Sequence, residues 1–151
     1  AYALNDEGYR EVIGLSVGAS EDAAFWTSFL RDLVERGLHG VQLVISDAHR
    51  GLKRAIASVF AGAAWQRCTV HFMRNVHAAV SRADQGMVTA AVRTVFNSHD
   101  YASGKEHLRQ VADKLQRTHP KVAAMLEEAE EDLLAYLTFP SAHWRQTCWS
   151  D

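Results

Sequence analysis

The spacing of apolar residues changes character near Phe72, and this change constrains the fold more than any other feature of the sequence. Before Phe72, stretches with a period of two or continuous apolar runs alternate with stretches of helical spacing. After it, apolar residues recur only at the three- and four-residue spacing of helices. The sequence therefore predicts an α/β half followed by an all-helical half.

The first half predicts three strands after a short initial one. Asn5–Gly8 has the residues of a hairpin turn, which would join a strand stub at Ala1–Leu4 to a strand at Tyr9–Val17. The nearly continuous apolar run Val41–Ile45 is typical of a strand buried on both faces. A further strand is predicted over about Ala64–Val70.

Two helices are predicted between these strands. Ser20 is a suitable N-cap residue, and Glu21 and Asp22 would place negative charge in the first helical turn. Gly37 would end this helix. A shorter helix is predicted from His49 to about Phe60.

The second half predicts helices with buried apolar stripes. Pro120 suits a first helical position, and the acidic run Glu127–Asp132 is expected to form a solvated helix face. The stripes comprise Val76 and Val80; Val88, Val92, Val95 and Phe96; Leu108, Val111 and Leu115; and Val122, Met125, Leu126, Ala129, Leu133 and Leu137.

Composition excludes several classes of protein. Hydrophobic residues make up 48% and charged residues 23%, which excludes a disordered chain. The sequence has no apolar run of membrane-spanning length and no secretion signal at its N-terminus. Two cysteines do not make a disulfide framework, so a cytoplasmic location is expected. The net charge is −2, so the chain is not a strongly basic module. Most contacts with DNA would then be made outside this chain.

Asp47 is the first candidate for chemistry, because it stands just past the predicted strand Val41–Ile45. Ligands of open α/β sheets gather at the carboxyl ends of strands, and a carboxylate there could hold Mg²⁺, which prefers oxygen ligands. The alternative is that Asp47 only caps the helix beginning near His49.

Cys68 and His71 form a Cys-x-x-His motif with several interpretations. A structural zinc site needs four ligands, and only His77 and Cys148 could complete one, so zinc is disfavoured. His71 could activate Cys68 as a nucleophile, but residues i and i+3 leaving a strand are expected to point to different sides. The third interpretation is a buried cysteine that fills core space.

Basic residues close in sequence to these positions could contact DNA phosphates. The candidates are His49, Lys53, Arg67 and Arg74. Taken singly, each is also compatible with an ordinary solvated surface charge.

Four segments together resemble the Mutator-like transposases of bacterial insertion sequences, over essentially the whole chain. The most specific feature is the motif that begins at Ser46, followed at a fixed distance by the Cys-x-x-His motif. The segments are Glu21–Trp26, Val44–Leu52, Trp65–Asn75 and Phe139–Trp144.

The resemblance implies a fold and a division of the chain. Residues 1–75 would be part of a ribonuclease H-like core that lacks its first strand, and residues 76–143 would be a helical insertion. Residues 144–151 would begin the segment that leads to a glutamate-bearing helix. The expected fold class is therefore α/β, a truncated ribonuclease H-like core followed by an all-helical insertion.

The resemblance also implies a catalytic site. Two aspartates and a glutamate would hold two Mg²⁺ or Mn²⁺ ions, and Asp47 would be the second aspartate. The other two acids would lie outside this chain, and Asp6 and Glu127 do not replace them. Cys68 and His71 would support the site or contact DNA without binding metal.

The expected activity of the intact protein is metal-dependent cleavage and transfer of DNA strands, with the element's terminal repeats and its target as partners. The fragment alone is expected to be inactive. Its unpaired strand edges predict either a homo-oligomer or a rearranged sheet. The alternative function is a non-catalytic module for self-assembly or DNA-end architecture; a Cys–His hydrolase is a third, weaker hypothesis.

Overall fold

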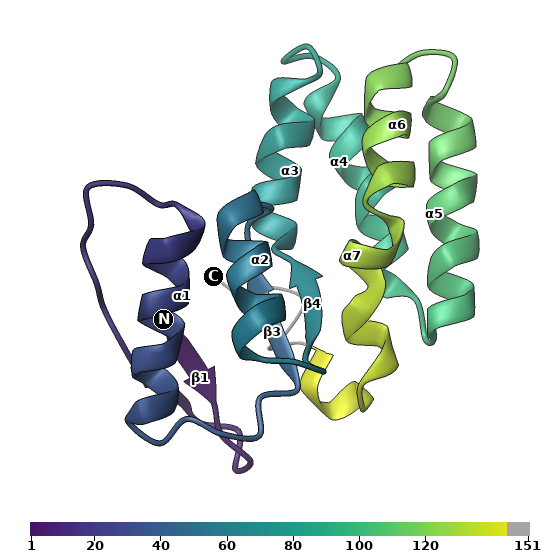
Figure 1. Cartoon of the computed structure of the whole chain (residues 1–151). Helices are drawn as coiled ribbons and strands as arrows, with labels where there is room; N and C mark the ends of the chain where they lie inside the picture. Colours follow the sequence, from purple (N-terminus) through teal and green to yellow (C-terminus); the bar gives the residue numbers. More distant parts are fainter. Residues whose placement is uncertain (145–151) are drawn as a thin grey trace. The chain divides into compact units, whose positions relative to one another are not determined.

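The structure is a computed structural model that describes residues 1–144 (Figure 1). The chain divides into two compact units, one spanning Ala1–Trp65 and the other beginning at Gln66. Each unit has its own cluster of buried apolar residues. The predicted order of an α/β half and a helical half is thus present in the fold.

The first unit opens with a hairpin of β1 (Tyr2–Leu4) and β2 (Arg10–Val12), paired antiparallel. Its turn is the predicted one: Gly8 has a φ of 85°, and the Asn5 side-chain oxygen accepts the backbone N–H groups of Glu7 and Tyr9. The prediction that the second strand continues to Val17 is wrong. β2 ends at Val12, and beyond it the Ile13 N–H still donates to the Ala1 carbonyl.

Helix α1 (Ala23–Glu35) confirms the predicted helix but not its start. The N-cap is Asp22, which accepts the Phe25 N–H at 2.9 Å and the Ser20 hydroxyl at 2.8 Å. These two bonds, the backbone one first, lower the pKa of the Asp22 carboxyl. Ser20 therefore supports the cap and is not itself the cap. The end is as predicted, with Gly37 at a φ of 107° just past the helix.

The first unit continues with β3 (Leu43–Ser46) and α2 (Arg50–Val59), and β4 (Ala64–Arg67) begins in it and ends in the second unit. β3 pairs with β4 in a two-stranded sheet separate from the hairpin. Val44 packs against the core of Leu30, Leu33 and Ile56 that α1 and α2 contribute. The expectation that β3 is buried on both faces is wrong: every residue of it is half-buried, because one core and one partner strand cover it.

The strand predicted over Ala64–Val70 is also shorter than expected. β4 ends at Arg67, and Cys68 occupies the N-cap position of α3 (Thr69–Ala78). The chain therefore changes from strand to helix within the Cys-x-x-His motif.

The second unit is helical, and α5 packs along α6 and against α7 (Figure 1). Pro120 takes the predicted first position of α6. The elements after α3 are α4 (Gln85–Arg93), η1 (Thr94–Asn97), α5 (Tyr101–Leu115), α6 (Pro120–Glu128), α7 (Glu130–Leu134), η2 (Ala135–Thr138) and η3 (Ser141–His143).

The predicted apolar stripes form the core of this unit. Val88, Val92, Leu108, Val122 and Leu126 are fully buried. Val80 and Met125 are only partly buried against the same core. Across residues 1–144, no helix combines the length and apolarity required to cross a bilayer.

The acidic run is solvated at Glu127, Glu128 and Glu131, as predicted. Glu130 differs because it accepts ion pairs from Lys105 at 2.9 Å and Arg109 at 3.1 Å. This carboxylate therefore ties α7 to α5.

Gln66 provides the main buried polar link of the second unit. Its side chain is fully buried. The amide nitrogen donates to the carbonyls of Leu133 at 2.9 Å and Arg67 at 3.0 Å, and the amide oxygen accepts the N–H of Tyr136 at 3.0 Å. One side chain thus joins the end of β4 to the segment where α7 passes into η2.

We expect Gln66→Leu to lower the free energy of unfolding by about 2–5 kcal/mol, because it leaves buried backbone groups at Leu133 and Tyr136 unsatisfied. Urea unfolding followed by circular dichroism measures this change. Gln116→Leu is the matched control, since Gln116 is exposed, and it should change stability by less than about 0.5 kcal/mol. Equal effects of the two substitutions would contradict the assigned role of Gln66.

Candidate functional site

Asp47 lies directly after β3 and is exposed. Within residues 1–144, its carboxylate receives no hydrogen bond and forms no ion pair. The N-cap of α2 is His49, whose Nδ1 accepts the Leu52 N–H at 3.3 Å. The alternative that Asp47 is a helix cap is therefore wrong.

A chain of two hydrogen bonds holds the backbone of Asp47. The indole N–H of Trp65 donates to the Ser46 hydroxyl at 2.9 Å, and that hydroxyl donates to the Asp47 carbonyl at 2.8 Å. The Lys53 ammonium lies 4.1 Å from the centre of the Trp65 ring, where cation–π attraction holds it. Ser46 and Trp65 are therefore positioning residues for Asp47. Neither role was predicted from the sequence, although each residue lies in a segment that carries the resemblance.

The absence of a side chain at Gly51 lets the first turn of α2 approach the start of α1. A Cβ atom at this position would lie 2.9 Å from the Ala23 nitrogen and 3.1 Å from the Asp22 carbonyl carbon, and both atoms belong to the backbone. The starts of the two helices therefore meet close to the segment that carries Asp47.

An open hollow of about 820 Å³ lies at this meeting point. Its charged groups have both signs, because Arg50 and Arg54 face Glu21 and Asp22. Arg50 and Arg54 are the cationic groups of this lining, and Glu21 and Asp22 are its anionic groups. Its lining is Glu21, Asp22, Ala23, His49, Arg50, Gly51 and Arg54.

Asp47 could supply one hard oxygen ligand to a divalent cation. In the part of the chain that the structure describes, no three His, Cys, Asp or Glu side chains converge on a common point. A metal site that included Asp47 would therefore need further ligands from outside the described residues. Cys148, one of the two residues that could complete a zinc site with Cys68 and His71, lies outside the described residues.

Cys68 and His71 are in contact, contrary to the expectation that they point to different sides. The Cys68 sulfur lies 3.2 Å from Nδ1 of His71. The expectation failed because the motif lies at the start of α3, where residues three apart share a face. Cys68 is only 8% exposed. Within the described residues no carboxylate orients His71, so the pair lacks the third group of a hydrolase triad.

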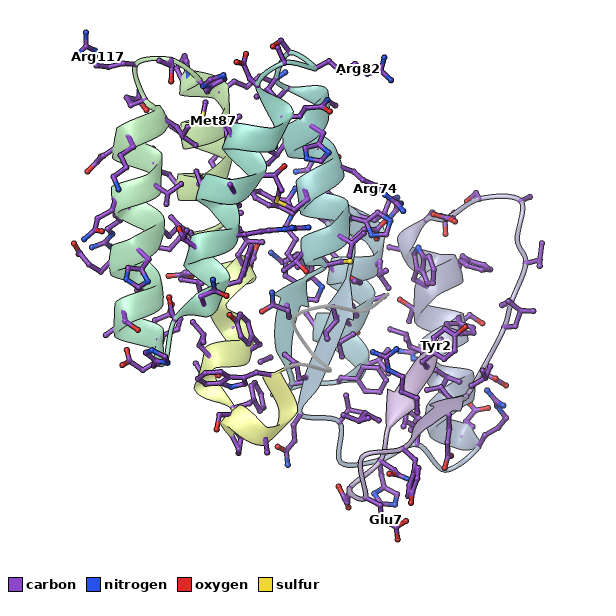
Figure 2. The ribbon with its side chains drawn as sticks, turned by 180° about the vertical axis from the view of Figure 1, so that it is seen from behind. Tyr2, Glu7, Arg74, Arg82, Met87 and Arg117 are labelled. Carbon is purple, nitrogen blue, oxygen red and sulfur yellow. The ribbon has the colours of Figure 1, made fainter. Side chains whose placement is uncertain are left out.

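The four residues predicted to contact DNA differ in their surroundings. His49 caps α2, and Lys53 lies over Trp65. Arg67 is half-buried, with its guanidinium 5.0 Å from the Phe72 ring centre. Arg74 alone is exposed and has no side-chain partner among residues 1–144; Figure 2 shows it pointing away from α3.

Comparison with known proteins gives a consistent result over the whole chain. The family described as "Transposase, Mutator family" matches residues 1–151. The transposase for insertion sequence element IS1081 of Mycobacterium tuberculosis is 43% identical over 151 residues, which is all of this chain and 36% of that protein. The transposase for insertion sequence element IS256 in transposon Tn4001 of Staphylococcus aureus is 36% identical over 147 residues, 96% of this chain and 38% of that protein.

A third relative gives the same picture. The transposase for insertion sequence element IS406 of Burkholderia multivorans is 36% identical over 144 residues, 95% of this chain and 37% of that protein. This chain therefore spans little more than a third of the length of these relatives.

We expect Gly51→Ala to destabilise the first unit by about 1–3 kcal/mol, because the new methyl group would overlap the α1 backbone. Gly86→Ala is the matched control: Gly86 lies in α4, and a methyl group there would meet nothing within 4 Å, so this change should stabilise by about 0.5–1 kcal/mol. Thermal unfolding of both variants tests the contrast. Destabilisation of similar size in both would refute the close approach.

Proposed function

The chain belongs to the Mutator family of transposases, and we propose that it forms part of a transposase catalytic core in which Asp47 is one of the metal-binding carboxylates. The observation that carries this proposal is the exposed Asp47 carboxylate at the end of β3, which has no side-chain partner among residues 1–144. Ordinary surface aspartates need no such support, whereas Ser46 and Trp65 fix the backbone at this one.

We propose a ribonuclease H-like arrangement for the intact core. The hairpin, α1, β3, α2 and β4 follow one another in the order that the resemblance implies, and the helical unit follows β4 where an insertion is expected. In this arrangement a further strand, from outside this chain, lies between the hairpin and β3. The separate pairing of β1 with β2 and of β3 with β4 agrees with a sheet interrupted at that place.

The role of the protein in the reaction follows from the chemistry of its side chains. When bound, Mg²⁺ or Mn²⁺ ions would activate the attacking oxygen and stabilise the leaving oxygen of a DNA phosphodiester. Asp47 would hold such an ion, and the bonds from Trp65 through Ser46 would keep its backbone in place. Arg50 and Arg54 at the neighbouring hollow would bind phosphate oxygens of the same DNA.

The DNA partner rests on the relatives, which are described as transposases for insertion sequence elements. We propose that the intact protein cleaves and joins DNA at the ends of such an element. Self-assembly of the intact protein stays a prediction from the open strand edges.

Asp47→Asn should abolish localised Mn²⁺ binding. In the ¹⁵N-labelled chain, dilute Mn²⁺ should broaden the amide signals of Ser46–Ala48 selectively, because the paramagnetic ion would sit at the Asp47 carboxylate. Asp6→Asn, an exposed aspartate in the hairpin turn, is the matched control and should leave this broadening intact. Broadening that persists in Asp47→Asn would favour the non-catalytic module.

The isolated chain should not cut DNA, because one carboxylate cannot assemble a two-metal site. Conversion of supercoiled plasmid to open circle in the presence of Mn²⁺ measures this directly. We expect no conversion above that of buffer. Nicking by the wild-type chain that disappears in Asp47→Asn would show that the fragment is active and would contradict the prediction.

A further inference from the structure

We infer that one end of the helical unit is a docking surface for the phosphate backbone of duplex DNA. The loop between α3 and α4 and the loop between α5 and α6 form this end, and a bond between His119 and Asp84, 3.4 Å long, joins them. We call this end, with Arg82, Lys114, Arg117 and Lys121, the basic tip. The inference rests on the proposed function for its choice of DNA, but it concerns a different surface from Asp47.

The two loops of the basic tip hold each other in place. Asp84 accepts the Ser81 hydroxyl at 2.6 Å and pairs with His119. The Ser81 bond first and the His119 contact second lower the pKa of the Asp84 carboxyl. This carboxylate therefore joins the two loops, and it stays ionised beside the cations of the tip.

The four cations of the basic tip are exposed. Within residues 1–144, none of them forms an ion pair. Figure 2 shows Arg82 and Arg117 extending outward from opposite sides of the same end, with Met87 between them. Against these four charges, the tip has only the engaged Asp84 and the exposed Asp113.

The charge of the second unit is separated along its length. Residues 66–144 contain as many Lys and Arg as Asp and Glu residues, so the unit has no overall excess of either sign. The exposed Glu127 and Glu128 are the last residues of α6, at the end away from the tip, and the exposed Glu131 follows in α7. α4 and α6 begin at the tip while α3 and α5 end there, so the helix dipoles largely cancel and the side chains set its potential.

These features fit a nucleic-acid backbone. Phosphates present a regular array of negative charge that exposed Arg and Lys side chains can contact without a groove or an apolar pocket. Two arginines on opposite sides of one end could contact separate phosphates, and the half-exposed Met87 could lie against a deoxyribose between them. Such contacts carry no sequence information and would orient the unit on DNA.

The other partner of matching charge is the acidic segment Glu127–Glu131 of a second copy. We favour DNA because the family acts on insertion elements, and because Glu130 of that segment is already paired with Lys105 and Arg109. A titration with duplex DNA separates the two partners.

Fluorescence anisotropy of the whole chain with a labelled duplex of mixed sequence, over a series of NaCl concentrations, tests the inference. In Arg82→Gln/Arg117→Gln, the apparent Kd at low salt should rise about tenfold, and the slope of log K against log salt should fall by about two, because each lost phosphate contact removes about 0.9. Lys114→Gln/Lys121→Gln should weaken binding in the same direction. The matched control Arg10→Gln/Arg31→Gln removes the same charge from exposed positions in the first unit and should change the slope little.

Three results would overturn the inference. The first is no binding by the wild-type chain, and the second is equal losses in the tip and control variants. The third is self-association without DNA that disappears in Arg82→Gln/Arg117→Gln, which would assign the tip to a second copy. The anisotropy test changes no residue at Asp47, and the Mn²⁺ test changes no residue of the tip. A negative DNA-binding result would therefore not affect the Mn²⁺ test of the proposed function. A negative Mn²⁺ result would not affect the inference about the basic tip.

Discussion

The approach of α2 to α1 at Gly51 is the constraint on which the rest of the first unit depends. Any side chain there would meet the backbone of Ala23 and Asp22, so only glycine lets the two helices start side by side. Because α2 begins at Arg50 with His49 as its cap, Asp47 is left outside the helix. The connection from β3 is thus short, and Ser46 and Trp65 hold it in place. A carboxylate placed this way has no structural partner among the described residues, which leaves it available for a ligand.

In the second unit, single side chains bind several polar groups at once. Gln66 satisfies three backbone groups in the interior, and Glu130 gathers Lys105 and Arg109 at the surface between α5 and α7. Lys105 and Arg109 are thus both paired with the same carboxylate. Arg82, Lys114, Arg117 and Lys121 form no ion pair among the described residues, and they give the basic tip its positive charge.

The sequence predicted features that depend on local spacing and backbone preference. The hairpin turn at Asn5–Gly8, the stop at Gly37, the Pro120 start and the helical stripes are confirmed because each follows from residues close in the chain. The ends of the strands were predicted too far along the chain, since a strand continues only where it is paired, and the pairing of β2 with β1 covers Arg10–Val12. The Cys68–His71 contact was missed because it depends on where β4 ends and α3 begins. Gln66 was missed because its partners lie some seventy residues away, and no local pattern reports such a contact.

Metal binding at Asp47 can be observed by anomalous diffraction from crystals of this chain soaked in Mn²⁺. We predict a peak at a coordination distance of about 2.1–2.2 Å from a carboxylate oxygen of Asp47, and no peak there in crystals of Asp47→Asn. Density for Mn²⁺ at Glu127, Glu128 or Glu131 with none at Asp47 would contradict the assignment of Asp47 as a metal ligand.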